Sequence, residues 1–466
     1  MRLSPTPEQL SLLQSALDRL REGFASLPDA PEHSADHAPD HTRPEAVAPA
    51  LPMQAVLQET ATRLHDNFPY HHPLYAGQML KPPHPVAQLA YALATSVNPN
   101  NHALDGGRAS SALEKEAVAQ LAAMFGWREH LGHLTGGGTM ANLEALWIAG
   151  QLAPGATVLA SSQAHYTHAR ISAVLGLPFE SVPCDTRGRM DLRALEARLA
   201  KGGVGAVVAT MGTTATGAVD PLGAILDLRA KHGFRVHADA AYGGYHVLAG
   251  NLARETSAAF ARIGEADSIV VDPHKHGLQP YGCGCVLHRD PSVGRFYRHD
   301  SPYTYFSSAE LHLGEISLEC SRPGAAAVAL WATQRLLPLE RGGEFVRGLE
   351  ASREAALELH AKLAADPRFM VGMTPELDIV VWGVRATSVS ASSAAARRVF
   401  EEAAKLGLHL ALAELPIAFF GGPIAAMHAD QPTLTALRSV LMKPEHREWL
   451  VEILARLDAA ADAARG

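Results

Sequence analysis

Polar side chains that could do chemistry follow four short apolar runs in the middle of the chain. These runs, which have the pattern of buried β-strands, are 157–161, 205–210, 234–238 and 268–272. His165, Thr213, Asp239 and Lys275 follow them within a few residues. In an open α/β sheet, ligands bind beyond the carboxyl ends of the strands. We therefore expect an imidazole, a hydroxyl, a carboxylate and an amine to converge on one edge of a sheet.

A glycine-rich loop precedes a helix-like stretch upstream of these runs. It extends from Thr135 to Thr139 with glycines at 136–138, and we expect Thr139 to be the N-cap of the helix. Glycines let backbone N–H groups approach an anion, and the helix dipole favours negative charge there. A phosphate site and a simple flexible turn both fit this loop. Its spacing matches neither a P-loop nor a complete dinucleotide fingerprint.

A phosphate site, a carboxylate, a stacking imidazole and a lysine together indicate pyridoxal 5′-phosphate. A lysine amine forms a Schiff base with the aldehyde of this cofactor, and a carboxylate keeps its pyridine nitrogen protonated, which makes the ring an electron sink. The chain has only eight lysines, so few residues compete with Lys275 for this task. We expect no metal ion in the site.

Helix-like stretches separate the apolar runs and continue after them. They span 140–151, 191–200, 222–232, 324–337 and 343–365. Strands that alternate with helices predict an α/β domain with a largely parallel sheet. The segment 282–287 (GCGCVL) reads as one more strand.

The two ends of the chain have different patterns. Residues 8–27 predict an amphipathic helix, and 28–51 have the Pro-, Asp- and His-rich composition of a linker. A strand-like segment at 379–384, with helices near 391–406 and 446–464, predicts a smaller α+β domain. The predicted parts are an N-terminal helix and linker, a large cofactor-binding domain and a small C-terminal domain, over 1–64, 65–342 and 343–466.

Composition excludes several classes of protein. Hydrophobic residues make up 47% of the 466 residues and charged residues 19%, which is typical of a chain with a large core. The net charge of −8 argues against a nucleic-acid-binding protein. Four cysteines without metal-site spacing, and the lack of a signal or long apolar segment, predict a cytoplasmic protein without membrane spans.

Several motifs, taken in order, resemble the pyridoxal-phosphate-dependent group II amino acid decarboxylases. The matching segments are GGGTMANLEAL at 136–146, QAHYTHAR at 163–170, GTTATGAVDPL at 212–222, HADAAYGG at 237–244, DPHKHG at 272–277, ECSRPGAAAVALW at 319–331 and LRSVLMKPEH at 437–446. The resemblance runs from about residue 65 to 455. It implies pyridoxal-phosphate fold type I, with a mostly parallel seven-stranded sheet in a large domain and a small C-terminal α+β domain.

The resemblance also implies roles for residues around the cofactor. Lys275 would hold it as an internal aldimine, and Asp239 would pair with the pyridinium nitrogen. His165 would stack on the ring, with Ala241 on the opposite face. Further cofactor contacts would come from Gly138, Thr139, His274 and Thr213, the first three at the phosphate and Thr213 near the ring. Thr213 could equally be a turn hydroxyl.

The implied reaction removes the α-carboxylate of an L-amino acid as CO2 and yields an amine. A tyrosine in 296–306 would protonate the α-carbon, and among Tyr297, Tyr303 and Tyr305 we favour Tyr305. Arg322 could bind a substrate carboxylate or the phosphate, or form a structural salt bridge. His72 resembles a substrate-side residue of the family, and a turn histidine is its alternative.

Other functions stay open at this point. An aldehyde lyase of the sphingosine-phosphate lyase type, or an aminotransferase, uses the same cofactor and fold, and a fold does not decide the reaction. A non-catalytic cofactor-binding protein is disfavoured because Lys275, Asp239 and His165 are all present.

Asp272 stands where many relatives have Asn. Members of the family are generally homodimers with sites at the subunit interface, so we expect a homodimer, and we expect its small-molecule substrate to be an amino acid.

Overall fold

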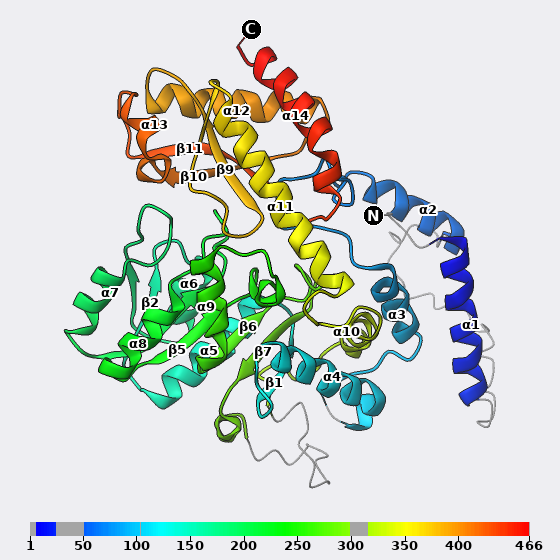
Figure 1. Cartoon of the computed structure of the whole chain (residues 1–466). Coiled ribbons are helices and arrows are strands. Elements are labelled where there is room, and N and C mark those ends of the chain that lie inside the picture. The colour runs from blue at the N-terminus through cyan, green and yellow to red at the C-terminus, as the bar shows by residue number, and fades with distance from the viewer. Residues whose placement is uncertain (1–5, 25–50, 103, 299–315, 466) are drawn as a thin grey trace, which may run out of the picture.

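The computed structural model describes residues 6–24, 51–102, 104–298 and 316–465 (Figure 1). A seven-stranded sheet lies in the lower part of the view, and a four-stranded sheet lies above it beside the C-terminal helices. Most of the predicted linker 28–51, and the tyrosine favoured as proton donor, Tyr305, lie outside the described residues. In the described part of the chain, no helix combines the length and hydropathy needed to cross a membrane.

The large sheet has seven strands in the order β1-β7-β6-β5-β4-β2-β3. Their bounds are β1 Leu131–Thr135, β2 Thr157–Ser161, β3 Phe179–Val182, β4 Val204–Thr210, β5 Arg235–Asp239, β6 Ser268–Val271 and β7 Gly284–His288. β7 is antiparallel to both of its neighbours, and the pairs from β6 to β3 are parallel. The predicted mostly parallel seven-stranded sheet is confirmed.

The central strands are apolar because both faces of the sheet are covered. On β6 and β7, Val270 and Val286 pack with alanines of α5, whereas Val271 and Leu287 belong to the main core on the other face. This alternation follows from the two-residue period of a strand. Burial on both faces fixes the strand ends, and so it fixes where the residues that follow them lie.

Helices surround the two sheets (Figure 1). In the N-terminal half they are α1 Pro7–Phe24, α2 Met53–Leu64, α3 Pro85–Thr95, α4 Leu104–Met124, α5 Gly138–Leu152, α6 Thr167–Val174, α7 Leu192–Leu199 and α8 Leu222–His232. In the C-terminal half they are α9 Arg254–Ala261, α10 Gly324–Leu336, α11 Glu344–Ala365, α12 Val389–Lys405, α13 Gly422–Ala425 and α14 His446–Ala463. The predicted helices outside the N-terminal segment agree with these bounds to within two residues.

The small sheet has four antiparallel strands in the order β10-β11-β9-β8. Their bounds are β8 Phe369–Val371, β9 Ile379–Val384, β10 Ala411–Pro416 and β11 Thr433–Val440. A separate core, which includes Trp382 and Leu450, joins this sheet to α11, α12 and α14. Ala76 also belongs to it, and its N–H donates to the carbonyl of His409. The division at 64/65 and 342/343 stays a prediction.

Candidate active site

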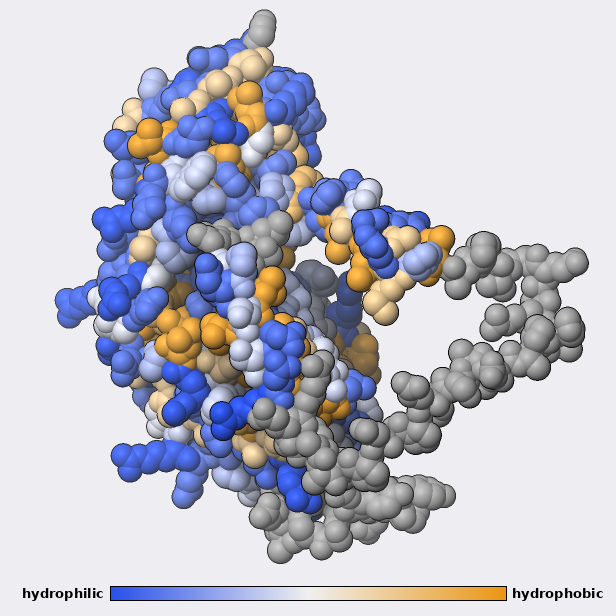
Figure 2. All heavy atoms as spheres, turned by 90° about the vertical axis from the view of Figure 1, so that its right-hand side faces the viewer, coloured by the Kyte–Doolittle hydropathy of each residue, from blue (hydrophilic) through white to orange (hydrophobic). Residues whose placement is uncertain are grey.

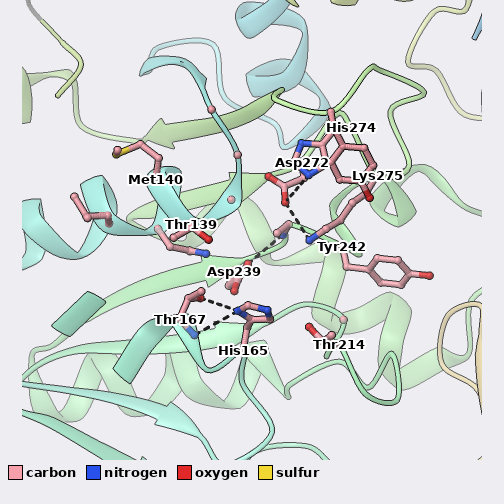
Figure 3. Close-up of a pocket in the computed structure, with 18 of the residues that line it drawn as sticks. Thr139, Met140, His165, Thr167, Thr214, Asp239, Tyr242, Asp272, His274 and Lys275 are labelled. Carbon is pink, nitrogen blue, oxygen red and sulfur yellow. Dashed lines mark hydrogen bonds and ion pairs between the residues drawn. The ribbon is translucent and has the colours of Figure 1, made fainter. Parts of the chain in front are cut away.

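A cavity of about 550 Å³ lies beyond the carboxyl ends of the central strands, next to the N-terminus of α5 (Figure 3). Its lining includes Gly136, Gly137, Gly138, Thr139, Met140, Asn142, His165, Thr167, Thr214, Asp239, Ala241, Tyr242, Asp272, His274, Lys275 and Tyr281. The side chains come from the segments after β1, β2, β4, β5 and β6. This position is the one that the parallel sheet predicts for a ligand.

Most of the residues selected from the sequence line this one cavity. They are Gly138, Thr139, His165, Asp239, Ala241, His274 and Lys275. They lie up to 137 positions apart in the chain (275 − 138) and meet because the strands that precede them run in the same direction and end at one edge of the sheet. Their individual roles stay predictions.

Thr213, His72 and Arg322 were also selected from the sequence, but they are not part of this lining. Thr213 is buried, and its Oγ1 lies 2.8 Å from Oγ1 of Thr216, whereas the next residue, Thr214, lines the cavity. His72 accepts a hydrogen bond from Leu74 N and packs edge-on against the ring of Trp449. These placements match the turn alternatives left open for both residues.

Arg322 is buried and paired inside the fold. Its Nη1 lies 2.7 Å from Oε1 of Glu114 and 2.6 Å from the carbonyl oxygen of Leu134. Its side chain is not part of the cavity lining. The geometry matches the structural salt bridge, one of the alternatives considered for this residue.

Lys275 forms an ion pair within its own turn. Its Nζ lies 3.0 Å from Oδ2 of Asp272, and the same oxygen lies 3.5 Å from Nε2 of His274 (Figure 3). Nδ1 of His274 is 2.8 Å from the carbonyl oxygen of Cys283, which fixes the ring. Sequence reasoning noted Asp272 only as a departure from relatives. The sequence did carry a signal for this ion pair, because Asp272 stands only three residues before Lys275.

Asp239 is a buried carboxylate that stays ionised. Burial opposes ionisation, but the hydrogen bond and charge of His168 outweigh it, so the pKa of Asp239 lies well below its usual value. Nε2 of His168 is 2.8 Å from Oδ2 of Asp239, and Ala241 N donates to Oδ1 at 3.2 Å. Sequence reasoning missed His168, although it stands three residues after His165.

His165 lies at the cavity wall beside the first turn of α6. Its Nδ1 is 2.8 Å from Oγ1 of Thr167 (Figure 3). Burial lowers its pKa below the usual value for histidine, and the nearby Asp239 carboxylate only partly opposes this. The ring is therefore mainly neutral near pH 7.

The glycine loop brings backbone close to the cavity. Gly137 is the N-cap of α5, so the prediction that Thr139 is the N-cap is wrong. Thr139 lies in the first turn of the helix. The reason is the backbone of Gly137, whose φ of 150° only glycine adopts readily. A Cβ on Gly138 would lie 2.6 Å from Oδ2 of Asp272. The first N–H groups of a helix lack acceptors within it, and they suit an anion.

Sequence comparison decides the family. A profile described as the pyridoxal-dependent decarboxylase conserved domain matches residues 148–385, which is more than half of the chain. The chain belongs to this family. It is a pyridoxal-phosphate-dependent carboxy-lyase that acts on amino acids.

Named relatives include decarboxylases of different amino acids. The L-tyrosine decarboxylase of Enterococcus faecium is 29% identical, with 68% of each chain covered. The L-aspartate decarboxylase of Thermococcus kodakarensis is 27% identical, with 71% of this chain and 84% of that protein covered. The crystal structure of mouse CSAD superposes with a TM-score of 0.76 at 21% identity, covering 98% of this chain and 99% of that one. This last likeness shows the fold.

The residues present fit the cofactor of the family. The cavity offers an amine at Lys275, a buried ionised carboxylate at Asp239 and the N-terminus of a helix, three groups that match its aldehyde, ring nitrogen and phosphate. Oδ1 of Asp272 is buried without a hydrogen-bond partner among the described residues. Buried polar atoms normally have such a partner, so a bound ligand could supply it.

Proposed function

We propose that this decarboxylase removes the α-carboxylate of an L-amino acid with Lys275 as the covalent anchor of pyridoxal 5′-phosphate. The observation that carries the proposal is that Lys275, Asp239 and the N-terminus of α5 border one cavity. The family supports the reaction class, and the geometry supports the assignment of residues.

Each chemical part of the cofactor has a partner in the chain. The Lys275 amine would bind the aldehyde carbon, and the Asp239 carboxylate would face the ring nitrogen. The backbone N–H groups of Gly138 and Thr139, with His274, would hold the phosphate. His165 and Ala241 would cover the two faces of the ring and exclude water from it.

When bound, the cofactor accepts the electron pair that is left when the bond to the carboxylate breaks. Asp239 supports this chemistry because its negative charge stabilises a proton on the adjacent ring nitrogen. Its burial strengthens that interaction, since water does not screen it. Lys275 supplies an amine that the substrate amine can replace.

The proton that ends the reaction needs a donor near the α-carbon. We propose Tyr305 for this step, on the resemblance alone, because the residue lies outside the described part of the structure. Tyr305→Phe should lower the yield of amine and raise aldehyde or ketone by-products. An unchanged yield without by-products would reject Tyr305.

We also propose that the protein is a homodimer. Exposed large apolar side chains gather on and beside α1 and α2, on the side that Figure 2 presents. They are Leu10, Leu12, Leu51, Met53, Val56, Leu57, Leu64 and Phe68. None of the residues of α2 is buried, and apolar faces of this kind mark interfaces. A stable, active monomer in sedimentation would reject the dimer.

We also propose that the protein is cytoplasmic. The four cysteines are all unpaired, and Cys283 and Cys285 are buried in the large domain. Unpaired cysteines are typical of a reducing compartment.

A screen of amino acids tests the reaction. Purified protein with pyridoxal 5′-phosphate should release CO2 from at least one L-amino acid, and Lys275→Ala should abolish the release. Relatives act on tyrosine and on aspartate, so aromatic and acidic amino acids come first. If no amino acid yields CO2, but a keto acid or a phosphorylated amino alcohol turns over, the aminotransferase or aldehyde lyase alternative replaces the proposal.

A further inference from the structure

Among the described residues, the carboxylate of Asp239 has one side-chain hydrogen-bond partner, which is a histidine from another element. His168 lies in the first turn of α6, whereas Asp239 ends β5. Their side chains are 1% and 7% exposed, and Nε2 and Oδ2 are 2.8 Å apart. Ala241 N occupies the other oxygen. The carboxylate is thus held in place from two sides while it still borders the cavity.

The hydrogen bonds of His168 determine where its proton lies. An ionised carboxylate only accepts, so Nε2 of His168 is the donor to Asp239. Nδ1 of His168 has no hydrogen-bond partner among the described residues. A proton on Nδ1 would be a buried donor without an acceptor, which is unfavourable. The proton on Nε2 therefore satisfies the hydrogen bond to Asp239.

The surroundings preserve the negative charge of Asp239. The neighbouring His237 lies edge-on to His168, with ring centroids 6.4 Å apart. It is tied to Asn142 and Ser268 through its two ring nitrogens. Burial lowers the pKa of His237 to about 3, so it carries no positive charge near pH 7. The charge of Lys275 also favours the ionised form of Asp239.

We propose that His168 is a positioning residue that holds Asp239 in orientation and makes it a weaker proton acceptor, so that the proton it faces stays on the ring nitrogen of the cofactor. The inference rests on the proposed function, because it presupposes that Asp239 meets that nitrogen. A hydrogen bond donated to a carboxylate lowers its proton affinity. Without His168, Asp239 would compete for the proton and its side chain would be free to turn.

The test uses cofactor-free protein and pyridoxine 5′-phosphate labelled with ¹⁵N in the ring. This compound lacks the aldehyde, so it does not attach to Lys275, and its binding isolates the other contacts. His168→Phe removes the donor, and His168→Gln keeps an N–H near the position of Nε2. His133→Phe is the matched control, because His133 forms a buried pair with Glu144 at 2.9 Å that does not line the cavity.

We expect His168→Phe to weaken binding about 10- to 100-fold, which is the range for a hydrogen bond to a charged group. The ¹⁵N shift should move from the protonated toward the unprotonated ring nitrogen. His168→Gln should restore most of the affinity and the protonated shift, and His133→Phe should change neither. Turnover should fall most in His168→Phe, less in His168→Gln and not in His133→Phe. The fold-decrease in kcat should exceed the fold-change in KM.

Two results would overturn the inference. One is that His168→Phe keeps the affinity and the protonated shift of the natural protein. The other is that His168→Gln is as impaired as His168→Phe, since the donor would then not be the cause. Asp239→Asn separates this inference from the proposed function: if it leaves binding and shift unchanged, the role of Asp239 itself is wrong. If Asp239→Asn is impaired and His168→Phe is not, only the role of His168 fails.

Discussion

The Nζ atom of Lys275 lies 3.0 Å from Oδ2 of Asp272, and both groups border the same cavity. The carboxylate holds the amine in an ion pair, and the amine must leave this pair before it can attack an aldehyde. Asp272 therefore opposes the attachment of the cofactor. Asp272 also lies against the glycine loop, because a Cβ on Gly138 would meet its oxygen at 2.6 Å.

Asp272→Asn should speed the attachment of pyridoxal 5′-phosphate to the cofactor-free protein by about tenfold, because the amine no longer has to leave a charged hydrogen-bond partner worth about 1.5 kcal/mol. Stopped-flow absorbance of the cofactor measures the rate. Asparagine keeps the size of the side chain, so a change in rate reports the charge. Attachment at the same rate as in the natural protein would contradict the inhibitory role of this ion pair.

Two adjacent threonines should have separable effects. Thr214 lines the cavity, and Thr213 is buried in its turn, where it accepts a hydrogen bond from Ala218 N. Thr214→Val should weaken cofactor affinity several-fold, by about 1 kcal/mol, and leave the unfolding midpoint unchanged. Thr213→Val should lower the free energy of unfolding by about 1–2 kcal/mol and leave affinity unchanged. Cofactor titration and urea unfolding measure the two quantities, and the reverse pattern would restore Thr213 as the contact.

Arg322 should matter for stability. Its removal leaves Glu114 buried without its cation, so Arg322→Met should lower the free energy of unfolding by about 3 kcal/mol. Arg262→Met, at the partly exposed pair with Glu265, is the control and should cost less than about 1 kcal/mol. Urea unfolding measures both. A rise in KM without loss of stability would instead favour Arg322 as a substrate contact.

Lys443 should make stability depend on pH. It is 1% exposed, its Nζ donates to Tyr75 O at 2.6 Å, and burial lowers its pKa to about 7. The unfolded chain, with an ordinary lysine pKa near 10.4, binds more protons above pH 7. The contribution of Lys443 to stability therefore rises with pH from about 7 to 10, by at most about 1.4 kcal/mol per pH unit.

Urea unfolding at pH 7.5 and 9.5 checks this for the natural protein and for Lys443→Met. The natural protein should gain more stability between the two pH values than the variant does. Equal changes would show that Lys443 does not titrate in this range.

The central strands were predictable because their burial on both faces leaves apolar runs such as the one in 205–210, which corresponds to β4. β1 and β3 were missed for local reasons. β1 contains Gly132 and His133, and β3 is a four-residue edge strand with two exposed residues, Glu180 and Ser181. In the small sheet, the Ala- and Leu-containing β10 and β11 lack a strand-like run, although β9 was found.

The candidate site was predictable where residues follow strands. His165, Asp239 and Lys275 meet because parallel strands end at the same edge. The contact of His168 with Asp239 was not predictable, because it joins residues 71 positions apart through the packing of α6 on the sheet. The N-cap at Gly137 depends on a backbone angle that composition alone does not specify.

The covalent role of Lys275 is the central claim, and one experiment tests it directly. Natural protein and Lys275→Ala are incubated with pyridoxal 5′-phosphate, reduced with borohydride and digested, and the labelled peptide is identified by mass spectrometry. The account predicts a visible absorbance band in the natural protein and a reduced adduct on the peptide that contains Lys275, both absent from the variant. An adduct on another lysine, or a band of equal strength in Lys275→Ala, would contradict it.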